Sequence, residues 1–445
     1  MLNGKSARYC TFATAANIQR NRLKHMEVKV FKFGGASLRT PEAIRNASKI
    51  VGLYPKEKLL IVASAMGKTT NAIEKLLELA IAGKANVADG SFENEWQQLK
   101  DYHLNIAKEL FPPGDEIFKT LDNQFDKITI GLQLNGDYDM VYDQVVSIGE
   151  LISTSILAAF LKKDFPIEWV DARKFVRTDS TFREGRVQWT ETETYIAALK
   201  PVLENKIIVT QGFIGSDSNG KTTTLGRDGS DYSAAVFASA LGAESVTIWK
   251  DVPGVMNGDP KRISGAVSFE ELPFKEAAEM TYYGASVIHP KTIKPLANRG
   301  IPLFVKNFDD PSSHGTKIHE CIVMNLPPLI VFKENQCLIS CKVTDYTFLE
   351  EQQLSAIFQA VAKLDIKINL MQNSAISFSF CVDFRQQKIT NLIDLLSTQF
   401  EVYYNTGLTL ITIKNYDGKT YSEYKQKPGI VLEQSSRSTL QLLIK

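Results

Sequence analysis

Short β-branched runs alternate with long amphipathic stretches before Asp309, and this alternation limits the possible folds more than any other feature. The runs are Val28–Phe33, Leu59–Ala63, Ile207–Thr210, Val246–Trp249 and Leu303–Val305. The stretches between them include Asn71–Ala82 and Val141–Leu161, with Glu93–Leu110 and Ile117–Ile128 as a predicted helical insertion. Strands that alternate with helices build βαβ units, in which helices cover both faces of a mostly parallel sheet. The sequence therefore predicts an α/β fold with such a sheet.

The pattern changes after Asp309–Gly315, where turn residues gather. The order strand, helix, strand, strand, helix, strand is then expected at Cys337–Val343, Leu349–Leu364, Lys367–Met371, Ile376–Asp383, Ile389–Phe400 and Glu401–Tyr404. This βαββαβ order is typical of a small α+β sandwich. Three more strands are expected at Leu408–Ile413, Gly429–Glu433 and Leu440–Ile444. The stretch between Lys414 and Pro428 is short and polar, so we predict a second, shortened copy that lacks its first helix.

A chain of 445 residues is longer than one hydrophobic core usually serves, so more than one domain is expected. We divide it into an extension (1–25), an α/β domain (26–320) and an α+β region (328–445), the last with a full unit (335–405) and a shortened one (406–445). The extension is basic, and the first acidic residue is Glu27. That composition fits a transit peptide. Because Met26 stands directly before the first strand, we favour an upstream start codon instead.

Charge and cysteine content exclude several classes of protein. Lysine and arginine number 51 against 50 aspartate and glutamate, which gives no electrostatic case for a nucleic-acid or membrane-surface partner. No uninterrupted apolar run reaches the roughly 18 residues that span a bilayer. The five cysteines are scattered and form no C-x-x-C pair, so we expect neither a metal site nor a disulfide framework. A cytoplasmic location fits this cysteine usage.

A glycine-rich loop, Lys32-Phe33-Gly34-Gly35-Ala36-Ser37, directly follows the first strand. Glycines let a backbone turn sharply and bring its N–H groups close to a ligand, and a following helix N-terminus favours anions. Lys32 adds a positive charge to the same crevice. A tight turn with a surface lysine explains the pattern equally well. The nearby Gly67-Lys68-Thr69 is not a P-loop, because the glycine required five residues earlier is Val62.

The most informative stretch is Gly220–Ala235, GKTTTLGRDGSDYSAA, which follows a strand and enters an apolar helix. Capping of that helix by Ser230 or Asp231 is one explanation. A cap needs only one such residue, and it leaves the three threonines and the lone Arg227 unexplained. A polar loop at a strand end that offers one arginine suits a carboxylate or phosphate ligand better. We therefore favour a binding site.

Further candidates follow other strands or lie on an apolar helix face. Thr70 and Asn71 come after the second strand, where ligands collect in parallel sheets, although they could cap a helix instead. Glu150 stands among apolar neighbours and needs either an ion-pair partner or a substrate ammonium. Asp251 and Lys261 could bracket a nucleotide or simply form a turn.

Seven motifs together resemble the aspartate kinase family of the amino-acid-kinase superfamily. They are KFGGASL from Lys32, SAMGKTTN from Ser64, SIGELIST from Ser147, VRTDSTF from Val176, VTQGFIGSDSNGKTTTLGRDGSDYSAA from Val209, WKDVPGVMNGDPK from Trp249 and YYGASVIHPKTI from Tyr282. The βαββαβ tail resembles the ACT amino-acid-sensing domain, which the family carries in pairs. The resemblance implies an αβα sandwich in which ATP and L-aspartate meet at the carboxyl ends of the strands.

The resemblance also implies roles for single residues. Lys32, the backbone of Gly34 and Gly35 and a Mg²⁺ ion would neutralise charge on the transferring phosphoryl group. Arg227 would bind the α-carboxylate of aspartate, Glu150 its ammonium, and Asp231 would organise Lys32 and the acceptor. The other residues beside the substrates would be Ser230, Thr70 and Asn71 for aspartate and Ser37, Lys250, Asp251 and Lys261 for the nucleotide. A carboxylate is already a nucleophile at neutral pH, so no general base is expected.

Four departures from the family pattern concern the nucleotide and the effector. Lys250 stands where the family often has threonine, Met256 where it has tyrosine and Ser286 where it usually has lysine. In the ACT unit, Asn373-Ser374-Ala375 replaces a Thr-Ser-Glu-like triplet. The resemblance implies a homodimer through the ACT region, and the surviving strands of the shortened copy can still complete its sheet. Because of the last departure and the shortened copy, we expect weak or absent inhibition by an amino-acid effector.

The resemblance implies an aspartate kinase that forms 4-phospho-L-aspartate, the entry step to lysine, threonine and methionine biosynthesis. One alternative is another kinase of the superfamily acting on a different carboxylate, but such a kinase would not be expected to combine Thr222–Asp231 with an ACT tail. The other is a non-catalytic amino-acid sensor. That reading requires a damaged phosphate loop, whereas Lys32, Arg227 and Asp231 are all present.

Overall fold

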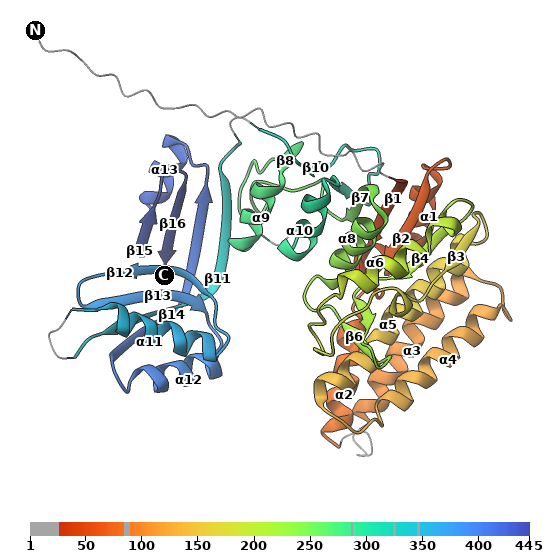
Figure 1. The fold of residues 1–445 in the computed structure, drawn as a ribbon, viewed down its shortest axis with the longest axis horizontal. Coiled ribbons are helices and arrows are strands. Elements are labelled where there is room, and N and C mark those ends of the chain that lie inside the picture. Colours follow the sequence, from red (N-terminus) through yellow and green to blue (C-terminus); the bar gives the residue numbers. More distant parts are fainter. Residues whose placement is uncertain (1–25, 84–89, 286–287, 324–325, 345–347) are drawn as a thin grey trace, which may run out of the picture.

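The computed structural model describes residues 26–83, 90–285, 288–323, 326–344 and 348–445. Figure 1 shows a larger unit, in which helices surround a sheet, beside a smaller unit that ends at the C-terminus. The predicted extension (1–25) and Ser286 lie outside the described residues.

The larger sheet has the strand order β3-β4-β2-β1-β7-β9-β10-β8. Its strands are β1 (Met26–Phe33), β2 (Lys58–Ala63), β3 (Ile167–Trp169), β4 (Ile207–Gln211), β7 (Ala243–Lys250), β8 (Glu271–Pro273), β9 (Leu303–Asn307) and β10 (Thr316–His319). Every neighbouring pair from β3 to β9 is parallel, as is β8 with β10, whereas β9 and β10 are antiparallel. This confirms the predicted mostly parallel sheet, and each of the five predicted runs lies in one of its strands.

Alternate residues of the central strand face two separate cores, one on each side of the sheet. Val28 and Val30 of β1 belong to one core, and Phe31 and Phe33 belong to the other. The first core is covered by α6 (Trp189–Ala197), α7 (Lys200–Leu203), α8 (Gly229–Leu241), α9 (Phe274–Tyr282) and α10 (Pro290–Arg299). The second is covered by η1 (Gly35–Leu38), α1 (Pro41–Gly52), α2 (Thr69–Ile81), α3 (Ser91–Leu110), α4 (Glu116–Gly131) and α5 (Tyr138–Leu161). The larger unit is therefore an αβα sandwich, and the predicted helical insertion corresponds to α3 and α4.

By length and composition α5 could cross a membrane, and it is the one described helix of which this is true. However, 78% of its apolar window is buried inside the structure. The helix contributes residues to the second core and, through Leu151, to the first. Its apolar sequence is therefore explained by packing on several sides within the larger unit.

The smaller sheet has the order β12-β13-β11-β14-β16-β15. Its elements are β11 (Leu329–Lys342), α11 (Glu351–Lys363), β12 (Ile368–Asn373), β13 (Ser377–Asp383), α12 (Gln386–Leu396), β14 (Glu401–Lys414), α13 (Gly418–Lys425), β15 (Ile430–Ser435) and β16 (Thr439–Ile444). The predicted βαββαβ order is present from the second half of β11 to the first half of β14. It forms a separate core with α11 and α12.

Two predictions about this region are wrong. The strands expected at Glu401–Tyr404 and Leu408–Ile413 are one strand, β14, because an irregularity in its pairing with β11 and a positive φ of 72° at Gly407 carry the strand through the apparent turn. A helix does form between Lys414 and Pro428. Asp417 caps α13, and Tyr424 within the helix is buried, so a helix of eight residues is stabilised at this position.

The second copy therefore has its first helix. The N-terminal half of β11, which the sequence did not predict as a strand, provides its remaining strand. Leu329–Lys333 pair with Leu410–Lys414 of β14, which in turn pairs with β16. The second copy is thus built from the C-terminal half of β14, α13, β15, β16 and the N-terminal half of β11.

Polar contacts join the two units through α9, which lies between them in Figure 1. The buried ammonium of Lys414, at the end of β14, lies 2.7 Å from Glu276 and is also paired with Glu279. The ammonium of Lys367 lies 4.1 Å from the ring centroid of Tyr282, the last residue of α9. Residues of the smaller unit thus contact α9 in its first turn, in its middle and at its last residue.

Candidate active site

A cavity of about 580 Å³ opens at the carboxyl ends of four neighbouring parallel strands, β4, β2, β1 and β7. Segments that follow these strands line it, together with α5 and the start of α8. It brings together eight predicted residues, Lys32, Gly35, Thr70, Glu150, Arg227, Ser230, Asp231 and Lys250. Open parallel sheets bind ligands at this position.

Lys32, Asp231 and Lys250 form a cluster of charges in this cavity, in which Lys32 and Asp231 are buried. The Lys32 ammonium, near the end of β1, lies 2.7 Å from Oδ1 of Asp231 in the first turn of α8. The Lys250 ammonium, at the end of β7, lies 3.5 Å from the other carboxylate oxygen. Burial alone would raise the pKa of Asp231, but the Lys32 and Lys250 ammonium groups hold the pKa of this carboxyl below its usual range. Two cations around one anion leave a net positive charge, which suits an anionic ligand.

Gly35 allows the loop after β1 to approach the loop after β2. A Cβ at this position would lie 2.6 Å from the carbonyl oxygen of Ala65, so a larger residue would displace the backbone. The Gly67 N–H donates to the Gly35 carbonyl at 2.9 Å. Gly34 borders the lining, and a Cβ there would lie 3.4 Å from the Lys32 ammonium. Gly35 therefore permits the loop after β1 to lie directly against the loop after β2.

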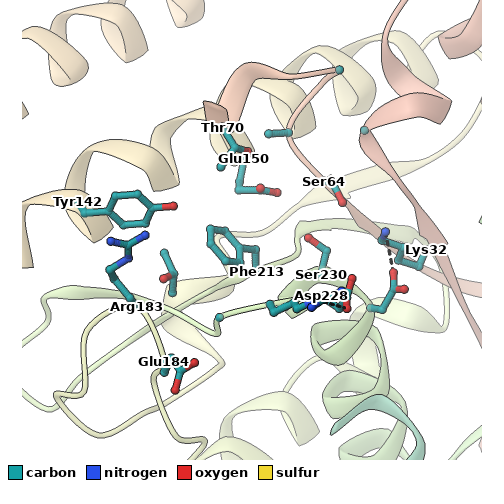
Figure 2. A pocket seen from close by; sticks show the side chains of 18 of the residues that line it. Lys32, Ser64, Thr70, Tyr142, Glu150, Arg183, Glu184, Phe213, Asp228 and Ser230 are labelled. Carbon is teal, nitrogen blue, oxygen red and sulfur yellow. Dashed lines mark ion pairs between the residues drawn. The ribbon is translucent and has the colours of Figure 1, made fainter. Parts of the chain in front are cut away.

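Glu150 reaches the cavity from α5 and is almost fully buried (Figure 2). Burial raises the pKa of its carboxyl to about 8, although the Ala65 backbone N–H and the Lys32 ammonium favour the charged form. Its Oε2 atom has no hydrogen-bond partner among the described residues. A ligand with N–H donors, such as an ammonium, would satisfy this oxygen and lower the pKa.

The threonine-rich block is a hairpin that leads into α8. Strand β5 (Ile214–Ser216) pairs with β6 (Thr222–Thr224), and the Thr223 hydroxyl lies 2.6 Å from that of Thr178. Thr224 is the one threonine of the three that lines the cavity. No side-chain hydrogen bond caps α8, which begins after Asp228, so the capping alternative for Ser230 and Asp231 is wrong. Both lie inside the first turn.

Arg227 stands at the mouth of the cavity. Its side chain is 82% exposed, and its Nε lies 3.7 Å from a carboxylate oxygen of the adjacent Asp228. The Arg227 guanidinium can therefore turn toward a ligand at little cost in lost contacts.

Five predicted residues lie outside this lining. Gly34 borders it, and Asn71 is exposed on the first turn of α2. Ser37 and Asp251 line a neighbouring hollow of about 420 Å³. Lys261 lines a third hollow of about 470 Å³, together with Met256 and residues of β11. The predicted nucleotide residues are thus distributed over three hollows, a separation that sequence order does not reveal.

Sequence patterns do not identify the far end of the cavity, where Figure 2 shows Tyr142, Arg183 and Glu184. The Arg183 guanidinium lies 4.1 Å from the Tyr142 ring centroid and 3.4 Å from a carboxylate oxygen of Glu74. Phe213 lines the middle of the cavity. Arg183 follows the VRTDSTF motif, but its left-handed backbone, with φ 64°, leaves no signal in the sequence.

The described residues contain no group of three or more His, Cys, Asp or Glu side chains that could hold a metal. Asp231 is engaged by two lysines. Mg²⁺ usually keeps several waters and is bound through one or two carboxylates and the phosphates of a nucleotide. The residues therefore fit a Mg²⁺ ion that arrives with its nucleotide.

Comparison with known proteins gives the family. The pattern of the amino acid kinase family matches residues 27–307. Lysine-sensitive aspartokinase 3 of Escherichia coli (strain K12) is 32% identical over 409 residues, which cover 88% of each chain. The chain belongs to the amino acid kinase family, in its aspartokinase branch. The chloroplastic aspartokinase 2 of Arabidopsis thaliana is 33% identical over 371 residues, 80% of this chain and 66% of that relative.

Solved aspartokinase structures share the whole architecture. The fold resembles that of E. coli aspartokinase III in complex with aspartate and ADP (R-state), with a TM-score of 0.80, 29% identity and coverage of 94% of this chain and 96% of that one. The complex of the same enzyme with lysine and aspartate (T-state) gives a TM-score of 0.76. The structural similarity to aspartokinase III therefore includes both the αβα sandwich and the ACT-like region of this chain.

Proposed function

We propose that the chain transfers the γ-phosphoryl group of ATP to the side-chain carboxylate of L-aspartate and forms 4-phospho-L-aspartate. The observation that most supports this proposal is the set of charged groups that line the cavity. It combines the Lys32–Asp231–Lys250 cluster, suited to phosphates, with the unsatisfied buried oxygen of Glu150, suited to an ammonium. The aspartokinase relatives support the same reaction, which is the entry step to lysine, threonine and methionine biosynthesis.

The reaction needs positioning and charge neutralisation more than proton transfer. A carboxylate oxygen of aspartate attacks the γ-phosphorus, the bond from this phosphorus to the bridging oxygen breaks, and ADP leaves with the electron pair. Lys32 neutralises charge on the transferring group, and Asp231 orients the Lys32 ammonium. Mg²⁺ supplies further neutralisation of phosphate charge when it is bound with ATP.

The acceptor occupies the part of the cavity around Glu150. Glu150 accepts hydrogen bonds from the aspartate ammonium, and Arg227 turns from the mouth to bind the α-carboxylate bidentately. Ser230 and Thr70 complete this side, and Asn71 can contribute only if the start of α2 shifts, because its side chain lies outside the lining.

The nucleotide extends from the cavity toward the two neighbouring hollows. Lys250 lies in the cavity, Ser37 and Asp251 in the second hollow and Lys261 in the third. The Gly34 and Gly35 backbone borders the phosphates. Met256 lines the hollow that contains Lys261 and offers the base an apolar contact.

Assembly and regulation follow from the ACT-like region. We place the homodimer contact there, and we expect an amino-acid effector to bind weakly.

The four described cysteines are free thiols, which is compatible with a reducing cytoplasm.

Product trapping tests the proposed function. Hydroxylamine converts an acyl phosphate to a hydroxamate, so wild-type enzyme with MgATP and L-aspartate should yield aspartate hydroxamate, and omission of ATP should abolish it. Absence of hydroxamate while the folded protein still binds amino acids would favour the sensor alternative.

A further inference from the structure

Asp143 lies in α5 two helical turns before Glu150, and its side chain is fully buried. Three donors converge on its carboxylate. They are the Thr224 hydroxyl at 2.7 Å, the Thr224 backbone N–H at 2.8 Å and the Arg183 backbone N–H at 2.9 Å. Thr224 and Arg183 come from different segments, and both line the cavity, whereas Asp143 does not.

The segments that Asp143 joins form one wall of the cavity. The Gly185 N–H donates to the Thr224 carbonyl at 2.8 Å, and a Cβ at Gly226 would lie 3.2 Å from the Arg183 carbonyl oxygen. Arg183 also has a φ of 64°, which a non-glycine residue adopts only when its surroundings impose it. The wall therefore depends on contacts that fix the Arg183 turn against Thr224.

We propose that Asp143 is a positioning residue for the acceptor substrate, because its carboxylate fixes the Arg183 turn and Thr224 as the far wall of the cavity without touching the substrate. The proposal rests on the proposed function, since it assigns this end of the cavity to aspartate. Tyr142 precedes Asp143 on α5, and the Arg183 guanidinium lies over the Tyr142 ring. The same helix therefore contacts both the backbone N–H and the side chain of Arg183.

A carboxylate is the group that this position requires. Its two oxygens offer about four lone-pair sites and no donor, which matches three converging donors. In Asp143→Asn the single oxygen can accept only the two backbone N–H groups, and the NH₂ group then faces the Thr224 hydroxyl, which must accept instead of donate. The variant therefore removes the negative charge from all three hydrogen bonds of the wall and reverses one of them, while it keeps the volume of the side chain.

The turn between β5 and β6 provides a matched control. Asp217 is also buried, and its Oδ1 accepts the backbone N–H groups of Asn219 and Lys221 at 2.9 Å each. It lies in the hairpin that carries Thr224 but not in the cavity lining. Asp217→Asn should lower the melting temperature of the protein as a structural change does, without altering the preference between substrates.

The test is steady-state kinetics of wild type, Asp143→Asn and Asp217→Asn, each at a temperature where circular dichroism shows it folded. Asp143→Asn should raise the KM for aspartate at least about tenfold and the KM for ATP much less, whereas Asp217→Asn should leave the ratio of the two KM values unchanged. An unchanged ratio in Asp143→Asn would overturn the proposal.

A second variant covers the case in which Asp143→Asn does not fold. Thr224→Val removes only the hydroxyl donor, so it should raise the aspartate KM by a smaller factor in the same direction, and an unchanged aspartate KM would overturn the proposal. A wild-type enzyme that does not phosphorylate aspartate would contradict the proposed function and this inference together. An active wild type with a normal Asp143→Asn variant would contradict this inference alone.

Discussion

The ammonium of Lys32 lies 2.7 Å from a carboxylate oxygen of Asp231, and both side chains are buried. One residue comes from β1 and the other from the first turn of α8. A buried ion pair costs desolvation free energy that a well-packed apolar pair would not. Its position at the carboxyl end of the central strand, with Lys250 beside it, supports the proposal that the pair belongs to a ligand site.

Lys32→Met tests the phosphoryl role. The turnover number should fall at least about a hundredfold with a much smaller change in the KM for ATP, because the charge acts on the transferring group. Lys29→Met is the control. Lys29 stands on the same strand and pairs with Glu57 at 2.6 Å outside the cavity, so its loss should leave turnover near normal. Near-normal turnover in Lys32→Met would remove this lysine from the mechanism.

Arg227→Lys tests the binding of the acceptor. Lysine keeps the charge but lacks the two parallel N–H donors of the guanidinium, so the KM for aspartate should rise far more than that for ATP. Arg299→Lys, a change in an arginine that pairs with Glu193 on the surface, should alter neither value. Equal rises in both KM values would mean that Arg227 orders the loop before α8 instead.

The raised pKa of the Glu150 carboxyl predicts that aspartate binding depends on pH. Burial raises the pKa of its carboxyl to about 8, so in the free enzyme it is protonated at lower pH and cannot accept an ammonium fully. The KM for aspartate should therefore fall as pH rises toward about 8, measured in buffers of constant ionic strength. Glu150→Gln should show a higher KM without this slope. The same slope in Glu150→Gln would assign it to another group.

The unliganded protein should show the opposite trend in stability. Because the folded state keeps a proton on Glu150 that the unfolded chain releases, the free energy of unfolding should decrease as pH rises from the ordinary range of a carboxyl toward about 8. Urea unfolding at several pH values checks this. The decrease should be smaller in Glu150→Gln, and an equal decrease in both proteins would contradict the assignment.

Much of the fold follows from local patterns, but the parts that depend on distant contacts do not. Runs such as Leu59–Ala63 and the apolar face of α5 are visible because burial on both sides imposes a composition. Gly407 looks like a turn between two strands, yet pairing with β11 continues across it. The strand at Leu329–Lys333 is absent from the prediction, and its partner strand lies more than seventy residues later in the chain.

The candidate site shows the same division. The glycine loop and the threonine-rich block are recognisable by their composition, and eight of the thirteen predicted site residues, including members of both segments, meet in one cavity. Asp143 and Arg183 give no such signal, since a buried carboxylate and a left-handed backbone become informative only when their neighbours are known. For Asp251 and Lys261 the order of residues in the sequence does not reveal that they line two hollows other than the one that contains Lys32.

The contact between Lys414 and α9 predicts a structural coupling. Lys414→Met leaves Glu276 and Glu279 facing one another without their shared cation. The free energy of unfolding should fall by about 1–3 kcal/mol, less than for a fully buried pair because Glu279 is partly exposed. Lys342→Met, an exposed position on β11, should change it little. Equal stability of the two variants in urea unfolding would contradict a role for this contact.

Inhibition by amino acids should be weak. Asn373-Ser374-Ala375 lies at the exposed turn between β12 and β13 and carries no carboxylate for an effector ammonium. Loss of one charge-assisted contact costs about 1.5–3 kcal/mol of binding free energy. Lysine and threonine, titrated separately at subsaturating aspartate, should inhibit poorly or not at all. Half-inhibition in the low micromolar range would contradict this expectation.

The most direct test of the central claim is ADP release by the purified full-length chain in a coupled assay with MgATP. Three parallel reactions contain L-aspartate, L-glutamate or no acceptor. The account predicts ADP release that depends on L-aspartate, with L-glutamate close to the reaction without acceptor. ADP release that is equal in all three reactions, or absent from all of them, would contradict it.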